Sequence, residues 1–83
     1  MITSAQCRAA RGLLGWSQQN LADRAGVGIM TIHQFEKGGS QPRRATLEVV
    51  RRAFENAGVE FIDENGGGAG LRLRKPGKGK PSE

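Results

Sequence analysis

The chain is poor in cysteine, histidine and aromatic residues, and it has no long apolar run. Its one cysteine, Cys7, cannot close an intramolecular disulfide, and one cysteine with one histidine is too few soft ligands for a structural zinc site. No stretch of about 20 apolar residues is present that would span a membrane. We therefore expect neither a metal nor a cofactor, and we expect Cys7 to pack as a small hydrophobic residue in a reducing cytoplasm.

The length of 83 residues permits one domain with a small core, since 36% of the residues are hydrophobic. The first residues, MITSAQCRAA, lack the apolar segment of a secretory signal, which favours a cytoplasmic protein. The sequence also shows no nucleophile paired with a base and no cluster of carboxylates. We therefore expect no catalytic residues and no enzyme activity.

Positive charge is unevenly distributed. The formal net charge is +5, but residues 71–83 carry five cations and one acid, which leaves a net charge of only +1 for residues 1–70. Within that part, residues 37–52 hold five cations against Glu48, and residues 54–64 hold four acids and no cation. This division predicts one surface that meets a polyanion and another that does not.

Local signals predict a first helix that begins beside Thr3 and ends at Gly15. Thr3 and Gln6 have the spacing of a capping box, in which each side chain bonds the other residue's backbone. Trp16 should cover the core where this helix ends. The residues expected on its packing side are Ala9, Ala10, Leu13 and Leu14.

Three further helices are expected before residue 58. Ser17 caps the second, and the third should run from Gly28 or Ile29 to Lys37, before a pair of glycines. The fourth should span about residues 43–57, with apolar residues at helical spacing at Leu47, Val50, Phe54 and Ala57.

Residues 59–63 and 70–74 alternate between apolar and polar on either side of a glycine-rich stretch, which predicts a β-hairpin. Residues 76–83 are basic and low in complexity, so we expect them to be disordered. The expected organisation is a helical domain over residues 1–58, a hairpin over residues 59–75 and a basic tail.

Residues 17–38, SQQNLADRAGVGIMTIHQFEKG, read as two short helices around the turn Gly26-Val27. This segment resembles the helix-turn-helix of the phage-repressor family (Cro and λ-repressor-like, or XRE), whose motif runs S-Q-x-x-L-A-x-x-A-G-V-S-x-x-T-I-x-x-F-E-x-G. The match extends to about residue 58 but departs at Gly28, where the family usually has Ser, and after residue 58, where a fifth helix is common. The resemblance implies a mainly α, compact four-helix bundle with a helix-turn-helix, here followed by a C-terminal β-hairpin.

The resemblance also implies that the second helix of the motif enters the major groove of double-stranded DNA. On the side turned away from the apolar stripe, that helix carries the expected base-reading residues Ile29, Met30, Thr31, His33 and Gln34. Gln34 can pair with adenine, and Ile29 or Met30 can pack on thymine methyl groups. Met30 can equally fold back onto the core, and His33 is expected near solvent or phosphate rather than at a metal.

Phosphate contacts are expected on both sides of this helix. Gln18 stands where members of the resembled family contact phosphate, and Gln19 is a candidate beside it. Lys37, Arg43 and Arg44 should meet the DNA backbone from the loop side, although Arg44 can equally be a solvated charge.

Glu36 is an acid on a helix expected to face a polyanion. The family pattern pairs this glutamate with an arginine of the first helix, and Arg11 stands at the matching position. The resemblance therefore implies a largely buried, structural ion pair between them, whose loss of one partner would cost about 3–5 kcal/mol.

The hairpin is expected to mediate dimerisation, because two short strands would be unstable alone and would leave exposed edges. One face should pack on the fourth helix and the other should carry Ile62 beside polar residues. A C₂ dimer would bury an edge together with Ile62, and it would present two reading helices to half-sites about 34–36 Å apart. The expected interface residues are Val59, Phe61, Ile62, Leu71 and Leu73.

These patterns favour a sequence-specific transcriptional regulator, more simply a repressor, that binds DNA as a homodimer. An alternative is a protein-interaction module, such as an antitoxin or antiactivator whose hairpin adds a strand to a protein partner. Nonspecific nucleic-acid binding through the basic tail is a third reading.

Overall fold

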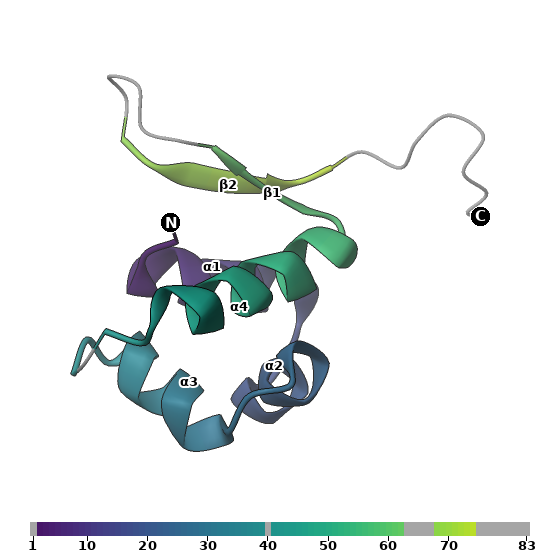
Figure 1. Cartoon of the computed structure of the whole chain (residues 1–83). Helices are drawn as coiled ribbons and strands as arrows, with labels where there is room; N and C mark the ends of the chain where they lie inside the picture. Colours follow the sequence, from purple (N-terminus) through teal and green to yellow (C-terminus); the bar gives the residue numbers. More distant parts are fainter. Residues whose placement is uncertain (1, 40, 63–67, 75–83) are drawn as a thin grey trace.

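The computed structural model describes residues 2–39, 41–62 and 68–74. The expected mainly α fold with a C-terminal hairpin is confirmed (Figure 1). The elements are α1 (Ser4–Leu14), α2 (Gln18–Ala25), α3 (Ile29–Glu36), α4 (Arg44–Asn56), β1 (Val59–Ile62) and β2 (Gly70–Leu73). Among the described residues, none of the helices has the length and apolar character needed to cross a membrane. The tail expected over residues 76–83 lies outside the described residues.

The first two helices start where their capping residues stand. Thr3 accepts from the Gln6 backbone and Gln6 accepts from the Thr3 backbone, each at 3.0 Å, and Ser17 forms the same reciprocal arrangement with Asn20. α1 ends at Gly15 in a left-handed conformation with φ of 70°, which residues other than glycine adopt only at a cost. The predicted boundaries of α1 and α2 are thereby confirmed.

The second pair of helices begins without side-chain caps. Gly28 precedes α3 and Arg43 precedes α4, and both have extended backbone conformations without a capping hydrogen bond from the side chain. α4 is slightly shorter than expected, because Arg43 and Ala57 are its flanking caps rather than members of the helix.

The core gathers apolar side chains from all four helices and from β1. Its largest fully buried members include Leu21, Ile32, Leu47 and Phe54. Trp16 is partly buried against this core and stacks on Phe54, with ring centroids 5.7 Å apart. This packing holds α2 and α3 in the fixed corner that a helix-turn-helix requires.

The expected packing side of α1 is wrong in part. Ala10 is buried and Leu14 packs against the core, but Ala9 is exposed and Leu13 is 45% exposed. Gln6 and Cys7 are buried in their place. Cys7 is fully buried, as expected, and the inward side of α1 is therefore more polar than the sequence suggested.

The hairpin lies across α1 and α4, on the opposite side of these helices from α3 (Figure 1). β1 and β2 are antiparallel with Val59 opposite Leu73 and Ile62 opposite Gly70. β1 contacts α4 as expected, but β2 contacts α1 instead. Leu73 is consequently 44% exposed rather than packed on α4.

Candidate nucleic-acid interface

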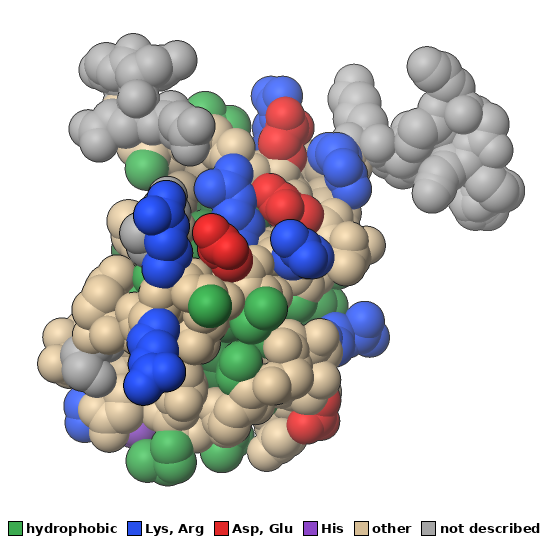
Figure 2. Space-filling model, in the orientation of Figure 1, with side chains coloured by type: hydrophobic (Ala, Val, Ile, Leu, Met, Phe, Trp, Pro, Cys, Tyr) green, Lys and Arg blue, Asp and Glu red, His purple; other side chains and the backbone are tan. Residues whose placement is uncertain are grey.

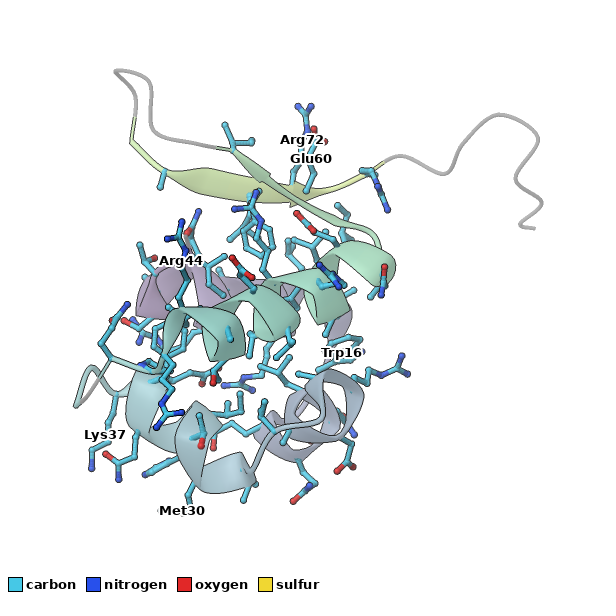
Figure 3. The ribbon with its side chains drawn as sticks, in the orientation of Figure 1. Trp16, Met30, Lys37, Arg44, Glu60 and Arg72 are labelled. Atoms are coloured by element: carbon cyan, nitrogen blue, oxygen red, sulfur yellow. The ribbon has the colours of Figure 1, made fainter. Side chains whose placement is uncertain are left out.

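The side of α3 that faces solvent, called its front below, carries both apolar and polar side chains. Ile29 is 38% exposed and Met30 is 60% exposed, so Met30 does not fold back onto the core. Figure 2 shows exposed hydrophobic side chains beside the histidine at the α3 end of the molecule, and Figure 3 shows Met30 pointing away from the core. The opposite side of α3 is buried through Ile32, Phe35 and Glu36. The helix is thus anchored at its back and open at its front.

Beside this front lies a small hollow of about 270 Å³, lined by Met30, Thr31, Gln34 and Pro42. Gln34 is half-buried, and a Cβ at Gly39 would lie 3.0 Å from its Oε1 atom. Because Gly39 has no side chain, the carboxamide of Gln34 has room to rest there. Of the lining residues, Pro42 was not foreseen, because it precedes α4 in sequence and only the fold brings it beside α3.

Glu36 is the centre of a buried polar cluster that joins α1, α2 and α3. Its side chain is 4% exposed, and Arg11 donates to both carboxylate oxygens at 2.7 Å through Nε and Nη2. Gln18 donates to Oε1 at 3.0 Å and Cys7 donates to Oε2 at 3.1 Å. Such bidentate, charge-assisted bonds fix geometry as well as adding energy, so this cluster sets the angle at which α3 leaves the bundle.

The cluster shifts the ionisation of its members. Burial opposes the charged form of Glu36, but hydrogen bonds from Arg11, Gln18 and Cys7 outweigh it, so the pKa of Glu36 lies below its ordinary value. The hydrogen bond to Glu36 raises the pKa of Arg11. Burial, followed by the bond to Glu36, raises the pKa of the Cys7 thiol. Glu36 and Arg11 are therefore charged, and Cys7 is an unreactive thiol at neutral pH.

The glutamines of α2 are already engaged within the chain. The Gln18 amide donates to Glu36 and the Gln19 amide donates to Asp23 at 2.8 Å. Both residues nevertheless stand in the first turn of α2, where backbone N–H groups precede the first intrahelical bond and the helix dipole is positive. The first turn of α2 thus keeps a positive helix end, while the amides of both glutamines bond carboxylates of the same chain.

Surface cations divide into paired and unpaired sets. Arg44, Arg51 and Arg72 each pair with a glutamate, at 3.7, 2.9 and 3.0 Å, and Figure 2 shows red and blue side chains interleaved over α4 and the hairpin. Lys37 and Arg43 are exposed and have no ion-pair partner within residues 2–39, 41–62 and 68–74. Figure 3 places Lys37 beside α3. Arg24 and Arg52 are likewise exposed without an ion pair in that part of the chain, so what distinguishes Lys37 and Arg43 is their position next to α3 and next to Pro42 at the hollow.

Arg8 was not identified from the sequence as a residue that joins α1 to α3. Its guanidinium donates to the backbone carbonyl of Glu36 at the end of α3. Arg8 and Arg11 are three residues apart, so they lie on the same side of α1. The spacing of these two arginines on α1 is the signal that could have identified it.

The hairpin residues expected at a dimer interface do not share one environment. Val59 is 1% exposed, and Phe61 is half-buried at 6.0 Å from Phe54, so both pack on their own chain. Ile62 is 37% exposed on the outer face, and Leu73 is exposed at the end of β2. Val59 is therefore corrected from an interface residue to a core residue.

Within the described part of the chain, no group of three or more histidine, cysteine, aspartate or glutamate side chains could hold a metal ion. In comparison with known proteins, a family model described as helix-turn-helix matches residues 8–59, which is more than half of the chain. No curated protein matches the chain significantly. The matched residues include all four helices apart from the first turn of α1.

Proposed function

Because the chain belongs to the phage-repressor-like (XRE) helix-turn-helix family of DNA-binding transcription regulators, we propose that it is a repressor that binds a palindromic operator as a homodimer. Repression by blocking polymerase needs no surface beyond the one that binds DNA. In this reading residues 1–58 form the DNA-binding domain and residues 59–75 form the dimerisation element.

The exposed front of α3 carries this proposal. Five side chains there offer the contacts that read a major groove, and their opposite side is fixed by Phe35 and by the Arg11–Glu36 pair. The carboxamide of Gln34 would pair with adenine, and Met30 and Pro42 would meet a thymine methyl group at the hollow beside it. The remaining base contacts would come from Ile29, Thr31 and His33.

Phosphate contacts would flank these base contacts. Lys37 and Arg43 are the favoured cations, because Lys37 directly follows α3 and Arg43 directly follows Pro42 at the hollow. Neither has a carboxylate partner in the described part of the chain. Arg44 would contribute less, since it is shared with Glu48. The first turn of α2, with Gln18 and Gln19, would contact the backbone on the other side.

Selection of bound duplexes from a random DNA pool tests the proposal. We expect one enriched sequence with two-fold symmetry, bound with an affinity that falls steeply as salt rises. An unenriched pool would contradict specific reading, and an enriched sequence without symmetry would contradict the homodimer. If the function were instead capture of a protein through the hairpin, binding would depend weakly on salt and would not require α3.

A further inference from the structure

An apolar groove lies between the exposed side of α1 and β2. Its volume is about 470 Å³, and it includes no residue of α3. Ala5, Ala9 and Leu13 recur every four residues, so they form one stripe along α1. β2 and the residue before it complete the groove through Ala69, Gly70 and Leu71. The stripe is exposed, because a different side of α1 packs against the core.

The edge of β2 that borders this groove carries backbone groups turned away from β1. The Arg74 N–H bonds the Gly58 carbonyl at 2.7 Å, which fixes the alternation of hydrogen-bonded pairs in the hairpin. Glu60 and Arg72 then form a hydrogen-bonded pair, whereas Leu71 and Leu73 stand in non-hydrogen-bonded pairs. The N–H and C=O groups of Leu71 and Leu73 therefore point outward from the sheet.

We propose that this groove binds the β2 strand of a second copy of the chain, antiparallel to its own β2 and with Leu71 opposite Leu71 of the partner subunit. The two hairpins would then form one four-stranded sheet. The inference rests on the homodimer proposed above and assigns its surface, which includes the stripe of α1 and excludes the buried Val59.

Charge excludes the symmetric registers that are centred nearer the end of β2. A pairing centred on Arg72 would place two arginines directly opposite each other, and one centred on Leu73 would place Arg72 opposite Arg74 of the partner subunit. A pairing centred on Leu71 instead places Arg72 opposite Gly70 of the partner subunit. This register avoids like charges in opposed positions and preserves the bond between Arg72 and Glu60.

The same register covers the exposed apolar side chains of the hairpin. On the side facing the helices, Leu73 would lie opposite Ala69 of the partner subunit, over the groove. On the outer face, the aliphatic part of Arg72 would cross Gly70 of the partner subunit toward that subunit's exposed Ile62, because Ile62 and Gly70 are cross-strand neighbours. One contact thus explains why Leu13, Ile62 and Leu73 are exposed in the single chain.

The symmetry also suits DNA binding. Two antiparallel strands in one sheet are related by a two-fold axis perpendicular to that sheet. α3 lies on the opposite side of α1 and α4 from the hairpin (Figure 1), so the axis leaves both copies of α3 on the same side of the dimer. That is the arrangement a palindromic operator requires.

Cysteine cross-linking tests the register on the full chain. In Leu71→Cys the two Cα atoms would be about 5.5 Å apart, within the range that a disulfide bridges, so mild oxidation should give a covalent dimer. Arg72→Cys and Leu73→Cys are the matched variants and should remain uncrosslinked, while the native Cys7 stays buried. Preferential cross-linking of Arg72→Cys or Leu73→Cys would overturn the register.

Sedimentation equilibrium tests the surface itself. Leu13→Glu should raise the dimer dissociation constant roughly 100-fold, since each of two copies loses about a factor of ten, with circular dichroism confirming that the monomer folds. Val49→Glu, at a similarly exposed apolar site on α4 outside the groove, should leave it unchanged.

The outcomes separate this surface from the proposed function. A dimer that survives Leu13→Glu, or one that is lost only in Val49→Glu, overturns the surface while symmetric operator selection still supports the repressor. A Leu71→Cys cross-link in a protein that enriches no DNA supports the surface and contradicts the function. A wild-type monomer at micromolar concentration overturns both the surface and the homodimer.

Discussion

Removing Arg11 should destabilise the fold more than removing Glu36, although the two residues form one ion pair. Glu36 is 4% exposed and Arg11 is 21% exposed, so the carboxylate is the member that cannot reach water. Arg11→Met leaves a buried charge that keeps only the bonds from Gln18 and Cys7. We expect a loss of about 3–5 kcal/mol in the free energy of unfolding.

Glu36→Gln should cost less, about 1–3 kcal/mol. The amide oxygen still accepts a hydrogen bond, and Arg11 keeps its bond to the Trp16 carbonyl at 3.0 Å and can turn toward solvent. The double variant Arg11→Met/Glu36→Leu should be more stable than Arg11→Met alone, because no charge is left buried.

Urea unfolding followed by circular dichroism at neutral pH measures these differences. A domain of this size has a total stability of about 4–12 kcal/mol, so Arg11→Met should lower the midpoint by a large fraction. A loss below about 1 kcal/mol in Arg11→Met, or a larger loss in Glu36→Gln than in Arg11→Met, would refute the reasoning from burial.

Three further predictions concern pH, backbone conformation and charge. Folding lowers the pKa of Glu36, so the stabilisation by its carboxylate is complete above the unfolded pKa of about 4.3 and is lost as pH falls through the folded pKa. Between pH 5 and pH 3 the urea midpoint should therefore fall more in wild type than in Glu36→Gln. Parallel plots of midpoint against pH for the two proteins would contradict this. Gly26→Ala should lower the free energy of unfolding by about 1–2 kcal/mol, because φ is 72° at that position. Gly12→Ala lies within α1 with nothing near the added Cβ, so it should raise the free energy of unfolding by about 0.5–1 kcal/mol. Thermal melts that rank the two variants the other way would count against the assigned conformations. Arg43→Gln should weaken binding to every DNA sequence alike and reduce the salt slope by about 1, and an unchanged slope would remove Arg43 from the phosphate contacts.

The helices could be predicted because their signals are local. Thr3 with Gln6, and Ser17 at the start of α2, determine helix starts within a few residues, and Gly15 ends α1 by the same short-range rules. The exposed side of α3 could be predicted as well, because the spacing of Ile32 and Phe35 identifies the buried side.

The buried side of α1 could not be predicted, because the helix has two apolar stripes. Cys7, Ala10 and Leu14 form one, and the stripe that lines the groove forms the other, so periodicity alone cannot choose between them. The hydrogen bonds of Gln18 and Gln19 could not be predicted either, because they depend on which carboxylates the fold brings near these side chains.

Parallel selection from one random DNA pool with wild type, Gln34→Ala and Arg43→Gln tests most directly whether the front of α3 reads bases. Gln34→Ala should lose its preference at one position of each half-site and keep the others, whereas Arg43→Gln should enrich the wild-type sequence unchanged. Identical sequences from wild type and Gln34→Ala, or a new sequence from Arg43→Gln, would contradict the assignment of base reading to α3.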